Sequence, residues 1–522
     1  MEVALRLFGA VQLLLYWLTL PVYWLWRRWY PGTRAPPPTD PMLLLSASRL
    51  AEGIRSQQLS SEQVVRAYVS RLREVDAVVH AVTDHRFQEA LAEARAVDQL
   101  VASGASTQEE LRRDSPLLGV PFTVKESCSL QGMSFAVGSL PRAGVKAAAD
   151  GVAVSCVRRA GGIPLCVTNT PELCLSFETD NLVSGRTLNP YDTLRTPGGS
   201  SGGEAALVGG GASVVGVGSD IAGSIRLPAM FCGVFGHKPT PGFVSTEGHL
   251  PHSPDPNFKT FLTVGPITRY AEDLRPMLRA MAGDSAPQLR LDEPVDLGKM
   301  RLFFMEDAGF SLVGVPVQKE IRASLRKAVE CLRTKYGMSV QTHKFKELEE
   351  SVEIGCSTLF SLKGIPQLLS DDDNPKKSRN LAVEFFKSLC GFSTISLQAL
   401  CFYLLMKVNS YTSSSRAAKY QADGVALRKK FTEMLGGDAV MLYPTSPVPA
   451  CHHLQVFVRS AAVLYVVLFN ALGLPATHVP TGLDSRRLPV GLQVIAGPGQ
   501  DRLCLAVAEA LEREFGGWVP PS

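Results

Sequence analysis

The chain lacks the patterns that usually mark a metalloprotein, a disulfide-rich secreted domain or a nucleic-acid-binding protein. Its 522 residues include eleven cysteines but no C-x-x-C pair, and its nine histidines show no spacing suited to zinc. The net charge is only +4, which is too small over this length to indicate nucleic acid. We therefore expect reduced cysteines, no metal, no cofactor and no nucleic-acid partner.

Charge is also missing from one long run at the N-terminus. Residues 7–26 contain no charged side chain, and twenty residues in a helix span about 30 Å, the thickness of bilayer hydrocarbon. Four of the five tryptophans fall in the first 30 residues, as in interfacial aromatic belts. A cleaved signal peptide is the alternative, but Arg27 and Arg28 stand where small cleavage-site residues would be needed. The pattern predicts a transmembrane anchor over residues 1–30, with the body of the protein on the cytoplasmic side.

After a proline-rich spacer over residues 31–41, helical and strand patterns alternate through residues 42–520. Ser60, with Gln63 three residues later, predicts the start of an amphipathic helix. Short apolar runs predict buried strands, of which one ends near Lys125 and another at Asp220. Because the two kinds of pattern alternate, we expect an α/β fold with a largely covered sheet.

A second uncharged stretch lies inside this body. Residues 388–406 run without a charge between Lys387 and Lys407, which would be long enough for another span. Glycine, serine, threonine and glutamine dilute the run, so we expect a core or membrane-surface helical segment instead. We interpret residues 381–407 as an apolar insert that faces a membrane or lines the path of the substrate.

The block "GGSSGGEAALVGGGASVVGVGSDIAGSIRLPA", residues 198–229, presents Ser200 and Ser224 on glycine-rich backbone. A phosphate loop would need a lysine after the glycines, whereas Glu204 would repel phosphate. An esterase elbow matches G-x-S-x-G at residues 198–202. That motif requires a buried strand before the serine, and "LNPYDTLRTP" with its two prolines is no such strand.

The third chemistry uses both serines and a lysine, and it fits best. A serine hydroxyl becomes a good nucleophile when a base removes its proton, and a lysine can be that base if its amine is neutral. Lys125 follows the apolar "GVPFTV", which would carry the amine into the interior. Ser224 follows Ile221, Ala222 and Gly223 at the end of a predicted strand, where successive N–H groups can converge on an oxyanion. Ser224 is therefore the better nucleophile, and Ser200 is the better proton relay.

The whole serine block resembles the amidase signature, which defines a family of hydrolases. "LLGVPFTVKES" is similar to the segment that carries the family's lysine, and "NTPEL", "FGHKPTPG" and "LPVGLQVIAGP" follow in the family's order. The resemblance covers residues 42–520. It implies one α/β domain with a mixed central β-sheet covered by helices.

The resemblance also implies roles for individual residues. Lys125 would be the base, Ser200 the bridging serine in a cis peptide, and Ser224 the acylated nucleophile. The implied oxyanion hole consists of the backbone amides of Ile221, Ala222, Gly223 and Ser224. We expect Asp220 and Arg226 to brace this turn, without themselves reacting.

Within the family, the anchor, the "GGSSGGE" variant and the apolar insert resemble the fatty-acid amide hydrolases, and among these the membrane-anchored type 2. This implies cleavage of long-chain primary amides and N-acylethanolamines to a free fatty acid and an amine. The expected partners are a lipid amide substrate and an intracellular membrane, of the endoplasmic reticulum or a lipid droplet, with a homodimer as a possible assembly. The alternatives are an amidase or esterase of short-chain or aryl substrates, and a lipid-binding scaffold without activity.

Overall fold

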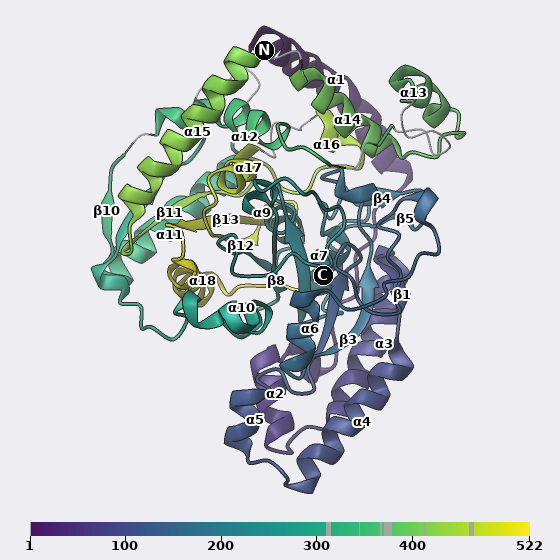
Figure 1. Cartoon of the computed structure of the whole chain (residues 1–522), viewed down its shortest axis with the longest axis vertical. Helices are drawn as coiled ribbons and strands as arrows, with labels where there is room; N and C mark the ends of the chain where they lie inside the picture. Colours follow the sequence, from purple (N-terminus) through teal and green to yellow (C-terminus); the bar gives the residue numbers. More distant parts are fainter. Residues whose placement is uncertain are drawn as a thin grey trace.

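An eleven-stranded mixed sheet forms the centre of the molecule (Figure 1). The computed structural model describes residues 2–309, 315–343, 345–365, 368–369, 378–410, 413–458 and 464–522. The strand order is β1-β3-β2-β6-β8-β7-β12-β13-β11-β9-β10. The strands are β1 Val82–His85, β2 Pro121–Lys125, β3 Ile163–Thr168, β6 Val215–Asp220, β7 Phe235–Lys238, β8 Thr263–Thr268, β9 Arg301–Phe304, β10 Ser339–Gln341, β11 Ala439–Pro444, β12 Ala476–Leu483 and β13 Pro489–Ala496, with β4 Asp180–Asn181 and β5 Gly185–Arg186 in a separate ribbon.

Helices cover both faces of this sheet. They are α1 Glu2–Trp29, α2 Ala47–Arg55, α3 Ser61–Val79, α4 Phe87–Ser103, α5 Gln108–Asp114, α6 Val152–Arg159, α7 Gly202–Gly209, α8 Arg226–Phe231, α9 Phe258–Phe261, α10 Leu274–Ala282, α11 Lys319–Tyr336, α12 Ser351–Leu359, α13 Leu381–Leu389, α14 Leu397–Ser410, α15 Ser414–Leu435, α16 Gln455–Val458, α17 Leu464–Ala471 and α18 Asp501–Phe515. Along β11, Val440 and Leu442 join one hydrophobic cluster, whereas Met441 and Tyr443 join another. Because neighbouring residues of a strand point to opposite faces, the two clusters lie on opposite sides of the sheet.

The α/β class is confirmed, and so are the elements that carry the site. β2 ends at Lys125, and β6 ends at Asp220, as the apolar runs predicted. Helix α3 begins at the predicted cap, because the Ser60 side chain accepts a hydrogen bond from the Gln63 amide at 3.4 Å. Strand β6 runs parallel to β2 and antiparallel to β8, which makes the sheet mixed.

The uncharged segment 388–406 is not one helix. α13 ends at Leu389, α14 begins at Leu397, and Gly391 between them adopts φ +77°. Leu400 is fully buried, whereas Phe392 is 80% exposed. The segment therefore contributes both to the core and to the surface.

The N-terminal helix α1 lies against α14 and α16 (Figure 1). The Tyr23 hydroxyl donates to the carbonyl of His453 at 2.6 Å, and the Tyr23 ring stacks on His452 with centroids 5.0 Å apart. Within the described ranges, no helix combines the length and the apolar character that crossing a membrane requires. The predicted transmembrane span is therefore not confirmed.

Candidate active site

The lysine and the nucleophile turn meet because their strands are parallel neighbours. β2 pairs with β6 in the register Val124↔Val217, so that both strands deliver their next residues to the same edge of the sheet. Lys125 is fully buried there. Its Nζ lies 2.6 Å from Ser200 Oγ and 2.9 Å from Ser219 Oγ, both hydrogen-bond distances. The structure thus places Lys125 and Ser200 in direct contact.

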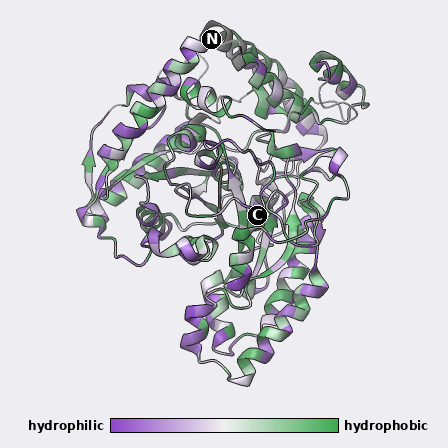
Figure 2. Cartoon of the chain, viewed as in Figure 1, coloured by the Kyte–Doolittle hydropathy of each residue, from purple (hydrophilic) through white to green (hydrophobic). Residues whose placement is uncertain are grey.

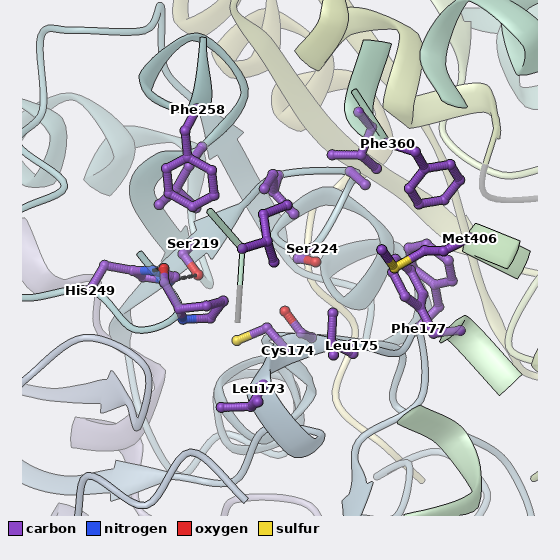
Figure 3. Close-up of a pocket in the computed structure, with 18 residues that line it drawn as sticks. Leu173, Cys174, Leu175, Phe177, Ser219, Ser224, His249, Phe258, Phe360 and Met406 are labelled. Atoms are coloured by element: carbon purple, nitrogen blue, oxygen red, sulfur yellow. Dashed lines mark hydrogen bonds between the residues drawn. The ribbon is translucent and has the colours of Figure 1, made fainter. Parts of the chain in front are cut away.

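Ser200 belongs to the loop that precedes α7. The Gly199–Ser200 peptide bond is cis, as the resemblance implied. The Thr170 hydroxyl donates to the Ser200 carbonyl at 3.0 Å and fixes the loop against the end of β3. Ser200 and Ser224 line the same pocket. Figure 3 shows Ser224 in this pocket. Within the described part of the chain, the Ser224 hydroxyl forms no hydrogen bond, so the structure places Ser200 in contact with Lys125 but joins Ser200 and Ser224 only as lining residues of one pocket.

The Asp220 carboxylate holds the turn that carries Ser224 by hydrogen bonds to two of its backbone amides. One carboxylate oxygen accepts the Gly223 N–H at 2.7 Å, and the other accepts the Ile225 N–H at 3.1 Å. The Gly223 amide is therefore occupied, which differs from the expectation that four successive amides face an oxyanion. Considering only described residues, the amides of Ile221, Ala222 and Ser224 donate to no partner, which leaves these three for the oxyanion.

Asp220 is itself balanced by a buried arginine. Arg226 donates to both oxygens of Asp220 at 3.1 Å, to Gln493 at 3.0 Å and to Asn470 at 2.6 Å. Burial alone would raise the pKa of Asp220, but the charge and hydrogen bonds of Arg226, together with Asn470, hold it well below its usual range. The carboxylate is charged and the pair braces the turn, in line with the expected structural role.

A second buried carboxyl, Glu204, lies beneath the lysine strand. It accepts hydrogen bonds from Thr123 on β2 at 2.7 Å and from Thr168 on β3 at 2.8 Å. Burial raises the pKa of Glu204 to about 8, although the hydrogen bonds from both hydroxyls act in the opposite direction. Glu204 is therefore protonated at neutral pH and adds no negative charge beside Lys125.

Two further residues of the site, Ser219 and His249, are not predicted by the sequence. Ser219 lies one residue before Asp220, and its Oγ is 2.9 Å from the Nε2 of His249. His249 comes from the segment after β7, 30 residues from Ser219 in the chain. No local pattern distinguishes it from the other histidines, since only the fold brings it to Ser219.

The pocket in front of Ser224 is almost entirely apolar. Figure 3 shows Ser219 and His249 on one side of Ser224 and the apolar side chains of Phe177, Phe360 and Met406 on the other. Phe402 and Met406 come from α14, so part of the apolar insert lines this pocket. The remaining lining residues, apolar apart from the thiol of Cys174, are Leu173, Cys174, Leu175, Ile221, Ala222, Pro251, Phe258, Leu262, Leu359 and Ile365. Across the described ranges, no cluster of three histidine, cysteine or acidic side chains could hold a metal.

Comparison with known proteins identifies the family of the chain. The Amidase family matches residues 63–505. The chain is 40% identical over 495 residues to "Fatty-acid amide hydrolase 2" of Homo sapiens, covering 93% of this chain and 92% of the relative. It is 41% identical over 493 residues to "Fatty-acid amide hydrolase 2-A" of Danio rerio, covering 94% and 92% of the two chains.

Solved structures share the fold. A structure described as "Fatty acid amide hydrolase" superimposes with a TM-score of 0.70 at 21% identity, covering 91% of this chain and 86% of that one. A peptide amidase from Stenotrophomonas maltophilia gives a TM-score of 0.70 at 23% identity, covering 91% and 98%. These likenesses support the α/β architecture alone, whereas the sequence matches extend to the family. The chain belongs to the amidase signature family, is an amidase, and is closely related to fatty-acid amide hydrolase 2.

Proposed function

We propose that the protein hydrolyses fatty-acid amides through an acyl-enzyme on Ser224, with Ser200 as proton relay and Lys125 as base. The observation that carries this proposal is the 2.6 Å distance between Lys125 Nζ and Ser200 Oγ, behind a pocket that also contains Ser224. Lys125 is fully buried, forms no ion pair with any residue in the described ranges, and has its Nζ between the hydroxyls of Ser200 and Ser219.

Acylation then proceeds by a proton shift through two hydroxyls. Lys125 accepts the Ser200 proton as Ser200 accepts the Ser224 proton, and the Ser224 oxygen attacks the amide carbon. The negative charge that develops on the carbonyl oxygen is stabilised by the amides of Ile221, Ala222 and Ser224.

The same route serves the second half of the reaction. The proton returns through Ser200 to the nitrogen of the amide, because an amine leaves poorly unless it is protonated. A water molecule then attacks the acyl-enzyme, and Lys125 accepts its proton along the same path. The free fatty acid leaves, and Ser224 regains its hydroxyl.

The pocket supports a long acyl chain as the substrate's distinguishing part. Its polar groups gather at Ser200, Ser219, Ser224 and His249, while the rest of the wall is aliphatic or aromatic. An acyl chain gains free energy there in proportion to the apolar area removed from water. The two relatives named as fatty-acid amide hydrolases fit the same substrate class.

We further propose that α1 attaches the enzyme to an intracellular membrane, of the endoplasmic reticulum or a lipid droplet. Gln12 and Tyr23, on the inner face of α1, donate to carbonyls of the catalytic body. Exposed apolar side chains recur on the other face at helical spacing, and Figure 2 shows the apolar character of this helix. These residues are Leu7, Val11, Leu14, Leu18, Val22, Leu25 and Trp29.

Covalent labelling by a fluorophosphonate tests the catalytic part. Ser224→Ala should abolish both labelling and amide hydrolysis, and Lys125→Ala should be nearly as severe. Ser200→Ala should slow labelling without removing it. Ser201→Ala is the matched control, because Ser201 bonds to the backbone of Ser219 and lies outside the proposed relay. A Lys125→Ala enzyme that is labelled at the parent rate would overturn the mechanism.

A series of primary amides with increasing acyl length tests the substrate class. We expect kcat/KM to rise with chain length up to long-chain amides. A maximum at short-chain or aryl amides would replace the fatty-acid assignment and leave the catalytic mechanism intact.

Flotation with liposomes tests the membrane part. Deleting residues 1–30, or placing glutamates at the exposed Leu389 and Phe392 near the end of α13, should reduce the fraction that floats. Unchanged flotation of the combined variant would refute membrane attachment through these surfaces.

A further inference from the structure

We propose that His249 is a positioning residue, which acts through Ser219 to set the direction of the hydrogen bonds around Lys125. In this arrangement the Lys125 lone pair faces Ser200. The inference rests on the proposed hydrolysis by Ser224, Ser200 and Lys125. It adds Ser219 and His249 to these three groups. Its basis is a chain of contacts that runs from the backbone at Pro251 to the catalytic amine.

This chain of hydrogen bonds begins at the Pro251 carbonyl, which determines the nitrogen of His249 that carries the proton. Nδ1 of His249 lies 2.9 Å from the Pro251 carbonyl oxygen, which can only accept. Nδ1 must therefore carry the hydrogen. In a neutral imidazole the other nitrogen is then an acceptor, so Nε2 presents a lone pair.

Burial keeps this imidazole neutral. His249 is 7% exposed, and burial lowers its pKa to about 3. His249 therefore cannot itself serve as a general base that cycles near neutral pH. What it offers is a fixed acceptor at Nε2.

Ser219 connects His249 to Lys125 and sets the direction of the hydrogen bond between Ser219 and the lysine. Its Oγ lies 2.9 Å from the acceptor Nε2, so the Ser219 hydroxyl donates in that direction. Its oxygen then accepts from Lys125 Nζ at 2.9 Å. A neutral amine has one lone pair, and with one N–H directed to Ser219 the lone pair is free to face Ser200 Oγ at 2.6 Å. This is the orientation that a base needs in order to receive the Ser200 proton.

Ser127 is a second hydroxyl near the same nitrogen. Its Oγ lies 3.1 Å from Nε2 and 3.5 Å from Ser219 Oγ. Ser219 is closer to Nε2, and of the two it alone also contacts Lys125. The route to the amine therefore runs through Ser219, and Ser127 lies beside it.

Two substitutions of His249 by amides of similar size separate the effect of its hydrogen bond to Ser219 from the effect of its volume. The amide of a glutamine reaches about as far as Nε2, whereas that of an asparagine reaches about as far as Nδ1. His249→Gln can keep an acceptor for Ser219, while His249→Asn can keep only the contact with Pro251. We expect His249→Asn to lower kcat by about tenfold to a hundredfold, the effect of leaving a buried hydrogen bond unmade. His249→Gln should restore most of this loss.

The measurements are the rate of fluorophosphonate labelling, and kcat and KM for a long-chain amide. Ser219→Ala should match His249→Asn, and the double variant should be no worse than either single one, because both break one chain. Ser127→Ala should have a smaller effect. His252→Asn, at an exposed histidine of the same segment, is the control and should leave both rates unchanged. KM should change little in each variant.

The outcomes distinguish this inference from the proposed function. If Lys125→Ala inactivates the enzyme but His249→Asn and His249→Gln have the same kcat as each other, the inference fails and the proposed function stands. Additive losses in the double variant would also overturn it, as would a Ser127→Ala effect equal to that of Ser219→Ala. If Lys125→Ala is itself fully active, the proposed function fails first. Thermal unfolding of each variant identifies a loss caused by misfolding, and in that case Ser219→Ala decides the question.

Discussion

Glu204 should make the stability of this protein depend on pH in a way that one isosteric substitution removes. Its carboxyl is fully buried between the hydroxyls of Thr123 and Thr168. Burial raises the pKa of Glu204 from 4.5 to about 8, against the opposing effect of those hydroxyls. Between the two values, the folded protein holds a proton that the unfolded chain has released.

The sign of the effect follows from that difference. The folded state binds more protons than the unfolded state in this window, so the free energy of unfolding falls as the pH rises from 4.5 toward about 8. The slope due to this one group is on the order of 1 kcal/mol for each pH unit. Below the window the carboxyl is protonated in both states, and above it the carboxyl is ionised in both, so the slope vanishes on either side.

Glu204→Gln keeps the shape of the side chain and cannot titrate. Urea unfolding of the parent and the variant, followed by circular dichroism from about pH 5 to 8, measures the difference in unfolding free energy. We expect that difference to grow in favour of the variant as the pH rises. Glu89→Gln, on the exposed side of α4, is the control and should run parallel to the parent. Parallel curves for Glu204→Gln would refute the conclusion that the buried carboxyl is protonated.

Three further substitutions test the turn and the pocket. Arg226→Met leaves the buried Asp220 carboxylate unpaired and should lower the free energy of urea unfolding by about 3–5 kcal/mol; an unchanged unfolding midpoint would argue against a supporting role. Gly223→Ala would place a Cβ 2.1 Å from a methyl of Val466 at a φ of +103°, so fluorophosphonate labelling should be lost, and a parent-like labelling rate would contradict this geometry. Phe402→Ala should raise KM for a long-chain amide by about tenfold and leave short amides unaffected, which an equal change for both would disprove.

Local patterns were sufficient to predict the elements that deliver the catalytic groups. The apolar runs before Lys125 and Asp220 are the buried strands β2 and β6, and the cap at Ser60 begins α3. The absence of a strand pattern before Ser200 also agrees with the loop found there. Such features depend on a few neighbouring residues, which is why the sequence is enough to predict them.

Features that depend on contacts between distant segments could not be predicted in this way. His249 meets Ser219 only because the segment after β7 folds back over the end of β6, and no residue near His249 indicates that contact. The sequence predicts four oxyanion amides, and in the structure one of them, that of Gly223, donates to the Asp220 carboxylate. Deciding between those two acceptors requires the path of the turn, which a one-dimensional pattern does not contain.

The N-terminal helix shows how a surface element can also bear on the pocket. The Tyr23 hydroxyl holds the backbone at His453, and the His453 ring lies 2.6 Å from the buried carboxylate of Glu178. Phe177, the residue next to Glu178, is part of the pocket wall. Deleting α1 would therefore loosen this wall as well as remove an apolar surface. Charged substitutions at Leu389 and Phe392 do not disturb that chain of contacts, so they separate membrane attachment from catalysis more cleanly than a truncation does.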